Sequence, residues 1–166
     1  MTEQATERKV AEAQTAALEL AKLDDDERSD ALHAVADALG ENEDRILDAN
    51  EKDVTEGEEM LEAGEYSQAL VDRLKLSPSK LEDIAEMVRS VAEQEDPLGR
   101  TLSARRLDDG LELYKVGVPI GVIGTVFESR PDALVQIAAL ALKSGNAVIL
   151  KGGSEASHSN RALFEI

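Results

Sequence analysis

The chain contains no cysteine and only two histidines among its 166 residues. Without cysteine it can form no disulfide, no thiolate metal site and no cysteine nucleophile of its own. His33 and His158 are isolated from each other in the sequence. We therefore also expect no histidine-based metal site.

Long apolar segments are absent as well. No apolar run approaches the roughly 20 residues that cross a bilayer, and the N-terminal sequence MTEQATERKV lacks the apolar region of a signal peptide. We expect no membrane association and a cytoplasmic location. The 42% hydrophobic content is enough to bury the core of about one domain.

Basic residues are scarce, and the formal net charge is −17. Residues 1–99 hold 28 acidic and 10 basic residues, whereas residues 100–166 hold 7 and 8. Such a surface repels phosphate backbones, so we expect no nucleic-acid partner. The acids alternate with periodic apolar residues, which indicates solvated faces of folded helices. Because hydrated carboxylates keep a protein soluble in strong salt, we hypothesise a salt-rich cytoplasm.

Residues 1–99 form the first predicted segment, an acidic helical part. Its clearest helix has Ser77 as N-cap and Pro78 at the first helical position, and should end before Pro97. Two earlier apolar stripes predict helices, the second stopped by Gly40, and another helix is predicted over about 42–62. The apolar residues at helical spacing are Val10, Ala13, Ala17, Leu20 and Ala21; Ala31, Leu32, Val35, Ala38 and Leu39; and Leu81, Ile84, Ala85, Val88, Val91 and Ala92.

Two further segments follow. Residues 100–118 are predicted to form a β-hairpin, because TLSARRL and LELYKVGV flank an Asp-Asp-Gly turn. Residues 119–166 are predicted to begin with a strand over 120–127 that is buried on both faces. A helix over 132–143 follows, which is covered nearly all round and ended by a left-handed Gly145, and then a strand over 147–150. The predicted fold class is α/β, in which N-terminal helices and a β-hairpin lead into a parallel βαβ unit.

Polar residues interrupt this apolar region where each predicted strand ends. Ligands collect at the carboxyl ends of parallel strands, where helix N-termini offer unpaired N–H groups. Two glycines, a hydroxyl and a lysine in the second loop suit a phosphate or ribose. The candidate binding residues are Glu128, Ser129 and Arg130 after the first strand, and Lys151, Gly152, Gly153, Ser154 and Glu155 after the second.

Each of these loops also has an ordinary structural interpretation. The second could be a Gly-Gly turn with a solvent-facing Lys151. Arg130 could pair with Asp132 or Glu128 at a helix start, or could clamp a carboxylate or acyl phosphate. His158 is interpreted as a polar loop residue. Neither G-x-G-x-x-G nor a Walker A sequence is present, so neither standard nucleotide-binding fingerprint applies.

The run KVGVPIGVIGTVFESRPDALVQIAALALKSGNAVILKGGSEASHSN closely resembles the glutamate-5-semialdehyde dehydrogenase (gamma-glutamyl phosphate reductase) branch of the aldehyde dehydrogenase superfamily. DANEKDV at 48–54, the stretch 71–99 and the hairpin are similar to it too, so the resemblance covers about residues 10–166. General aldehyde dehydrogenases have Pro-Trp-Asn after the first strand, with the asparagine stabilising an oxyanion. This sequence has Glu-Ser-Arg there, so that role is assigned to no side chain.

The resemblance implies NADPH-dependent reduction of L-glutamyl 5-phosphate to L-glutamate 5-semialdehyde and phosphate, in L-proline biosynthesis. In the family a cysteine thiolate displaces phosphate to give a thioester, which hydride from the nicotinamide reduces. Residues 119–166 would then begin the NADP-binding domain, with Lys151 beside the adenosine half of the cofactor. Because the chain has no cysteine, we expect an N-terminal piece of a longer enzyme that is inactive alone, with the nucleophile downstream of Ile166.

Other interpretations stay open. The chain could be a noncatalytic nucleotide-binding or assembly module, or part of a reductase of another acyl phosphate or thioester. In the superfamily a hairpin near this position packs into an oligomerisation element. The resemblance therefore implies a homo-oligomer formed through about residues 101–117, whereas the alternative is a hairpin that covers its own domain.

Overall fold

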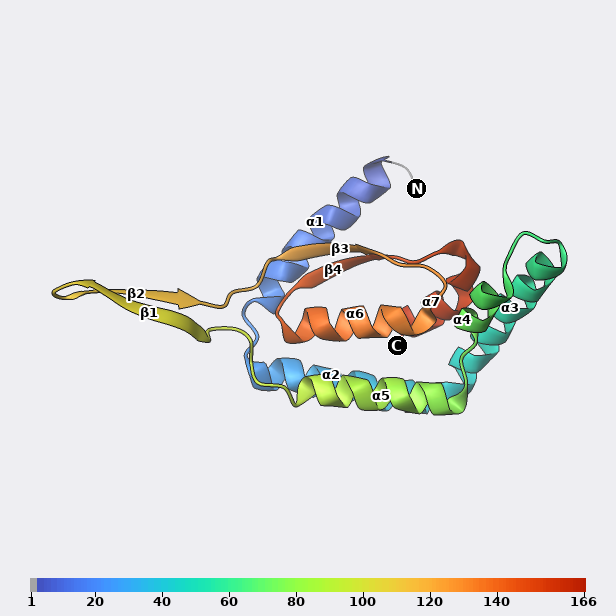
Figure 1. Cartoon of the computed structure of the whole chain (residues 1–166), viewed down its shortest axis with the longest axis horizontal. Helices are drawn as coiled ribbons and strands as arrows, with labels where there is room; N and C mark the ends of the chain where they lie inside the picture. The colour runs from blue at the N-terminus through green and yellow to red at the C-terminus, as the bar shows by residue number, and fades with distance from the viewer. Residues whose placement is uncertain (1–2) are drawn as a thin grey trace.

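The computed structural model describes residues 3–166, in which helices, a hairpin and a βαβ unit follow one another (Figure 1). The predicted α/β fold class is confirmed, and the short helix α4 had not been predicted. No helix within these residues is long and apolar enough to cross a membrane. The elements are α1 Glu3–Leu20, α2 Asp25–Glu41, α3 Glu43–Glu62, α4 Gln68–Leu74, α5 Pro78–Ala92, β1 Thr101–Asp108, β2 Leu111–Val116, β3 Val122–Val126, α6 Pro131–Lys143, β4 Ala147–Lys151, the 3₁₀ helix η1 Ser154–Ala156 and α7 Ser157–Phe164.

Local signals set the ends of the acidic helices. Ser77 caps α5 by accepting a hydrogen bond from the Lys80 N–H at 3.2 Å, and the helix ends before Pro97 as predicted. The predicted stop at Gly40 is wrong, because α2 continues to Glu41. Gly40 does not adopt a left-handed φ. The end is held by Asn42 instead, whose Nδ2 donates to the Ala38 carbonyl at 2.8 Å.

The apolar stripes of α2 and α5 pack into one core with α3, α6 and α7. The apolar residues of this core are largely those predicted on α2 and α5, and burying each large one contributes about 1.5–3 kcal/mol. The stripe of α1 is covered less well, since Val10 is 39% exposed and none of the five predicted residues on this stripe is buried. The buried core residues are Leu32, Ala36, Leu39, Ile46, Leu81, Ile84, Ala85, Val88, Val91, Ala92, Leu134, Val135, Ala139 and Leu163.

The two later strands form the predicted parallel pair. β3 and β4 run side by side in register from Val122 opposite Ala147 to Val126 opposite Lys151, and α6 joins them. Gly145 ends the α6 region with φ +67°, as predicted. The prediction that the first strand is buried on both faces is wrong, since Val126 is 79% exposed. In residues 3–166, β3 and β4 pair only with each other, so each has one neighbouring strand.

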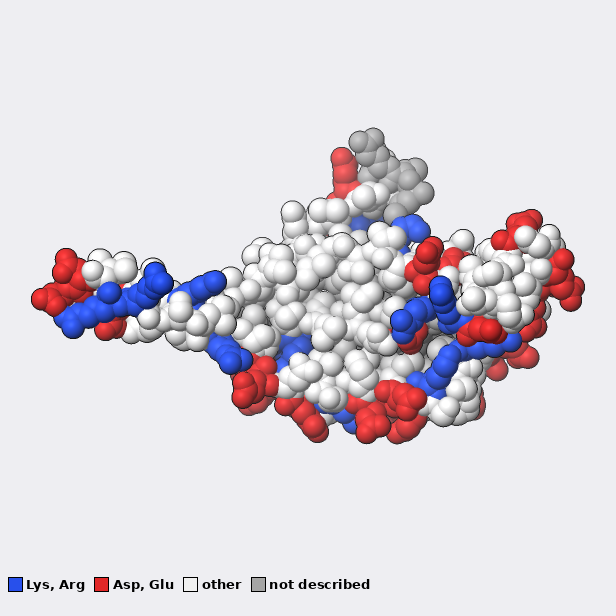
Figure 2. Space-filling view, in the orientation of Figure 1, with Lys and Arg blue, Asp and Glu red and all other residues white. Residues whose placement is uncertain are grey.

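The hairpin and the charged residues occupy the outside of the molecule. β1 and β2 pair antiparallel around the predicted Asp-Gly turn, project from the body, and are exposed at every residue (Figure 1). Asp and Glu gather over α2, α5 and α3, while the surface over β3, β4 and α6 is largely uncharged (Figure 2). The only buried charged residues in the described chain are Arg28, Asp53 and Lys143. The interpretation of the acids as solvated helix faces is confirmed.

Candidate active-site loops at the strand ends

The two polar loops leave the sheet at the same edge. Val126 and Lys151 lie opposite each other at the ends of β3 and β4, and the Phe127 N–H donates to the Lys151 carbonyl at 3.1 Å. The loops after them therefore begin next to each other, as predicted from the parallel βαβ pattern. They are joined again further on, where Ser129 donates hydrogen bonds to the Glu155 carboxylate.

The first loop places its three candidate residues differently. Glu128 is exposed, Ser129 is 5% exposed, and Arg130 is an exposed residue at the N-cap of α6. Arg130 Nη2 lies 2.7 Å from Asp132 Oδ2, so of the two carboxylates considered it pairs with Asp132. This hydrogen bond and the Asp132 charge raise the pKa of the Arg130 guanidinium, which stays cationic.

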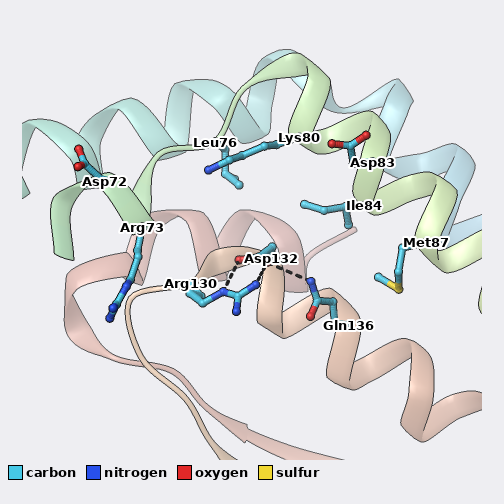
Figure 3. Close-up of a pocket in the computed structure, with 10 residues that line it drawn as sticks. All are labelled: Asp72, Arg73, Leu76, Lys80, Asp83, Ile84, Met87, Arg130, Asp132 and Gln136. Atoms are coloured by element: carbon cyan, nitrogen blue, oxygen red, sulfur yellow. Dashed lines mark hydrogen bonds and ion pairs between the residues drawn. The ribbon is translucent and has the colours of Figure 1, made fainter. Parts of the chain in front are cut away.

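Arg130 lies at the edge of a cleft of about 370 Å³ between the α4–α5 segment and the start of α6 (Figure 3). The cleft contains two cations that had not been singled out from the sequence, Arg73 and Lys80. No carboxylate of residues 3–166 pairs with either, and Lys80 Nζ donates to the Lys75 carbonyl at 2.6 Å. The lining residues are Asp72, Arg73, Leu76, Lys80, Asp83, Ile84, Met87, Arg130, Asp132 and Gln136.

The sequence contained one signal for this cleft. Arg73 and Lys80 belong to the 10 basic residues of the strongly acidic segment 1–99. A basic residue is therefore uncommon there, and two of them converge on one cleft with Arg130. Unpaired cations facing a concave surface favour an anionic ligand.

The second loop uses its glycines for packing against this chain's own side chains. A Cβ added to Gly152 would lie 2.4 Å from Asn160 Nδ2, and one added to Gly153 would lie 2.1 Å from Glu155 Oε1. Lys151 is exposed, and its Nζ donates to the Gly152 carbonyl at 3.0 Å. Ser154 is exposed at the start of η1. The side chains of Lys151 and Ser154 are therefore the exposed polar groups at the start of this loop.

The stretch 48–54, which the sequence singled out only by resemblance, supports the end of the second loop. The buried Asp53 of α3 accepts hydrogen bonds from the Ser159 N–H at 2.7 Å, the Ser159 hydroxyl at 2.6 Å and the His158 N–H at 3.0 Å. Asn50 donates to Ser159 Oγ at 3.0 Å. The interpretation of His158 as a loop residue is wrong, because these bonds hold it in the first turn of α7.

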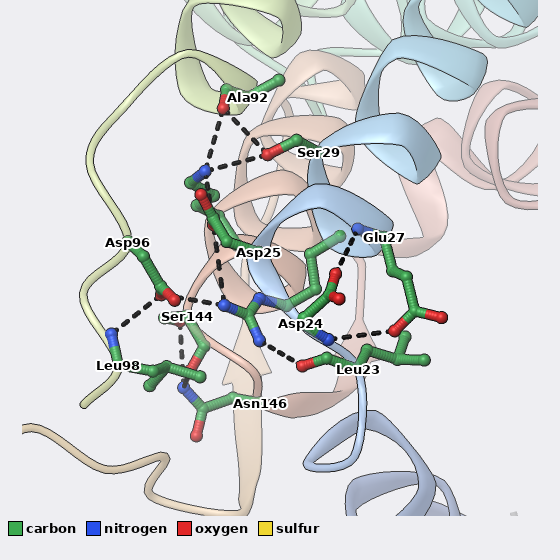
Figure 4. Close-up of polar contacts among 12 residues, drawn as sticks. Leu23, Asp24, Asp25, Glu27, Ser29, Ala92, Asp96, Leu98, Ser144 and Asn146 are labelled. Atoms are coloured by element: carbon green, nitrogen blue, oxygen red, sulfur yellow. Dashed lines mark hydrogen bonds and ion pairs between the residues drawn. The ribbon is translucent and has the colours of Figure 1, made fainter.

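A second buried polar cluster fixes α6 and the sheet on the helical part (Figure 4). Lys143, at the end of α6, donates to Asp25 Oδ1 at 2.7 Å, Ser29 Oγ at 3.0 Å and the Ala92 carbonyl at 2.9 Å. Arg28 beside it donates to Asp96 Oδ1 at 2.8 Å. Because these contacts join α6 to α2 and to the end of α5, and α2 to Asp96 beyond α5, the cluster sets where the strand ends lie relative to α5.

Comparison with known proteins agrees with this geometry. The model of the aldehyde dehydrogenase family matches residues 1–166. The chain is 75% identical over its whole length to the gamma-glutamyl phosphate reductase of Natronomonas pharaonis, and 69% identical over 97% of its length to that of Haloquadratum walsbyi. Both are halophilic archaea. The chain spans 38% and 35% of the length of these two relatives.

Solved structures match in fold as well. The gamma-glutamyl phosphate reductases of Saccharomyces cerevisiae and Thermotoga maritima both superpose with a TM-score of 0.87, at 40% and 36% identity. They match 92% and 95% of this chain, which in turn covers 38% and 37% of theirs. A probable aldehyde dehydrogenase from Listeria monocytogenes shares the fold at 16% identity and a TM-score of 0.65. The chain belongs to the aldehyde dehydrogenase family.

Proposed function

We propose that the complete gene product reduces L-glutamyl 5-phosphate to L-glutamate 5-semialdehyde and phosphate with NADPH, a step of L-proline biosynthesis. The observation that carries this proposal is the 75% identity, over all 166 residues, to a gamma-glutamyl phosphate reductase. A sequence identity of 75% points to the gamma-glutamyl phosphate reductase branch of the family, whereas the sequence identity to a probable aldehyde dehydrogenase is 16%. Such a biosynthetic reaction fits a cytoplasmic protein.

The cleft beside Arg130 is our candidate for the substrate site. The substrate carries a phosphate and a carboxylate, and the cleft contains Arg73, Lys80 and Arg130. The substrate also carries an ammonium group, and Asp72 and Asp83 line the same cleft. A mixed-charge cleft suits an amino-acid derivative better than a plain acyl phosphate. In this assignment Glu128, Ser129 and Arg130 form the loop at its edge.

The second loop is our candidate for the NADPH site. Lys151 would meet a phosphate or ribose of the adenosine half, and Ser154 offers a hydroxyl at the start of η1. Gly152, Gly153 and Glu155 shape the loop through the packing described above. Bound NADPH supplies a hydride for the reduction. The residues of this chain position the reactants, and the chain contributes no cysteine nucleophile.

The activity is tested by following NADPH oxidation by the complete gene product with L-glutamyl 5-phosphate and, side by side, with acetyl-coenzyme A. We expect turnover that requires the glutamyl phosphate and releases phosphate. Preferential use of acetyl-coenzyme A would favour a reductase of another acyl compound. NADPH binding without turnover of either substrate would favour a noncatalytic nucleotide-binding module. We expect the 166-residue chain by itself to be inactive, because its lack of cysteine removes the nucleophile.

A further inference from the structure

Glu155 and Ser129 join the two active-site loops. Glu155 Oε1 accepts a hydrogen bond from the Ser129 backbone N–H at 2.5 Å and a second one from the Ser129 hydroxyl at 3.2 Å. Ser129 is 5% exposed, so water does not compete freely with these bonds. The carboxylate comes from the loop after β4, and the groups that donate to it come from the loop after β3.

The backbone at Ser129 needs such support. Ser129 has φ +54°, and it is the only residue other than glycine with a positive φ in the described part of the chain. A left-handed conformation costs a non-glycine residue roughly 1–2 kcal/mol, so it persists only where surrounding contacts hold it. The residue that follows Ser129 is Arg130, the N-cap of α6. The conformation at Ser129 therefore sets where the chain enters α6 beside the cleft.

Gly153 makes the contact possible. A Cβ at this position would lie 2.1 Å from Glu155 Oε1 and 2.2 Å from Oε2. Those distances are far inside van der Waals contact, so no side chain fits there while the Glu155 carboxylate folds back over Gly153. The glycine leaves room for the carboxylate to reach Ser129.

We propose that Glu155 is a positioning residue for the loop after β3, residues 128–130, at the edge of the candidate substrate cleft. Glu155 itself lies in the loop after β4, which we assign to the cofactor. It holds Ser129 in the left-handed conformation and so keeps Arg130 at the edge of the cleft. The inference rests on the proposed function for its kinetic consequences, but the contact itself is independent of the reaction. Glu155 thereby couples the loop after β4 to substrate binding after β3.

The kinetic test compares two substitutions of Glu155 in the complete gene product. Glu155→Ala raises the KM for L-glutamyl 5-phosphate about tenfold or lowers kcat by a similar factor, while the KM for NADPH changes by less than about twofold. Glu155→Gln keeps most of the activity, because its amide oxygen still accepts from the Ser129 N–H. Glu51→Ala, an exposed position on α3, is the surface control. A rise in the KM for NADPH alone would overturn the proposal and make Glu155 a cofactor contact.

A double-mutant cycle tests the backbone argument directly. Glycine adopts a positive φ without help, so Ser129→Gly should remove most of the penalty of Glu155→Ala. We expect the effect of Glu155→Ala to be at least about threefold smaller in the Ser129→Gly background. Additive effects of the two substitutions would overturn the proposal, because they would mean that Glu155 acts on something other than the conformation of Ser129.

Hydrogen exchange gives a measurement that does not need activity. Amide exchange in a peptide spanning residues 127–131 should be faster in Glu155→Ala than in the unsubstituted protein, and near normal in Glu155→Gln. Unchanged exchange in Glu155→Ala would overturn the proposal, even in an active enzyme. Absence of glutamyl phosphate turnover in the unsubstituted protein would instead count against the proposed function, and the exchange experiment would still decide the role of Glu155.

Discussion

At the scale of single residues, the molecule buries very few charges and surrounds each with partners. Asp53 is 1% exposed and accepts three hydrogen bonds, and Lys143 is 3% exposed and donates three. An unpaired buried charge would cost several kcal/mol, so the partners are what make burial tolerable. Asp53 thereby joins α3 to α7, and Lys143 joins α6 to α2 and α5. Arg130 and Lys151, in contrast, are exposed.

The first prediction concerns the two exposed cations. Arg130→Ala should raise the KM for L-glutamyl 5-phosphate about 10- to 100-fold, and Lys151→Ala should raise the KM for NADPH more than that for the acyl phosphate, because each would remove the charge-assisted contact to an anion that we propose for it. Steady-state kinetics with both substrates varied measures the split, with Arg8→Ala and Lys52→Ala as exposed controls. Unchanged kinetics with a lower melting temperature in Arg130→Ala would show that the residue serves only its ion pair with Asp132.

The second prediction concerns Asp53. Asp53→Asn should lower the free energy of unfolding by about 2–3 kcal/mol, because the amide offers one acceptor oxygen where the carboxylate accepts from three donors of α7. Denaturant unfolding measures the change, and Glu51→Gln on the exposed face of α3 is the matched control. Equal stability of the two variants would contradict the role of Asp53 as the cap of α7.

At the scale of elements, the turns are the points where one residue decides the path of the chain. Gly145 follows α6 with φ +67° and packs against Leu98 and Pro119. Asn146 follows it and accepts hydrogen bonds from the Ile120 and Gly121 N–H groups at 2.6 and 2.9 Å. This short segment ends the helix and also aligns the beginning of β3 with β4. The hairpin differs, because all its residues are exposed.

The loss of stability caused by substituting Gly145 can be separated into a backbone contribution and a packing contribution. Gly64 has nearly the same conformation, with φ +76°, but an added Cβ there meets nothing within 4 Å, whereas at Gly145 it would lie 2.7 Å from Leu98 Cδ1. Gly64→Ala should therefore lower the free energy of unfolding by about 1–2 kcal/mol, and Gly145→Ala by roughly 2–4 kcal/mol. Thermal unfolding of both variants checks this order. Equal losses would contradict the packing contribution.

The hairpin is our candidate for an oligomerisation element. Leu102, Leu107, Leu111, Leu113 and Tyr114 are each more than half exposed on it, and apolar surface of this kind is typical of an interaction site. Leu113→Asp should shift the complete gene product from an oligomer to a smaller species, because a buried carboxylate disfavours association. Sedimentation velocity measures the mass, with Lys115→Gln on the same strand as control. An unchanged mass in Leu113→Asp would favour a hairpin that covers its own domain.

At the scale of the whole molecule, the main feature is the excess of acidic side chains on the surface. The net charge of −17 lies mostly on the helical part, and nearly all of it is exposed. Mutual repulsion of like charges destabilises a compact state, and salt screens it over a Debye length that falls from roughly 10 Å at 0.1 M to roughly 3 Å at 1 M. Two of the relatives come from halophilic archaea, which agrees with the hypothesis of a salt-rich cytoplasm.

The salt dependence can be measured. Raising KCl from about 0.1 M to about 2 M should increase the melting temperature of the complete gene product by roughly 5 °C or more, and its solubility too, because screening removes repulsion between carboxylates. Sucrose at the same osmolality is the control for effects of excluded cosolvent. A melting temperature that falls with KCl, or that rises equally in sucrose, would contradict the electrostatic explanation.

Much of the fold could be predicted from the sequence, because short-range signals set its elements. Ser77 with Pro78 starts α5, Asp109-Gly110 turns the hairpin, and Gly145 ends the α6 region; each acts through bonds to residues a few positions away. The alternation of strand and helix then indicated a parallel pair, and with it the common edge at which residues 128–130 and 151–155 lie. The ligands of these loops stay predictions.

Only the tertiary structure decided which side chains meet. Glu155 reaches Ser129 across 26 residues of sequence, Lys143 reaches Asp25 across 118, and Arg73 and Lys80 join Arg130 at one cleft. No local pattern predicts such contacts, because they depend on how α6 and the sheet are seated on the helical part. By itself the sequence determined most of the elements, the charge and the lack of a cysteine nucleophile. The packing decided that the Glu155 carboxylate turns toward Ser129, which is possible because Gly153 has no side chain in the space that the carboxylate occupies.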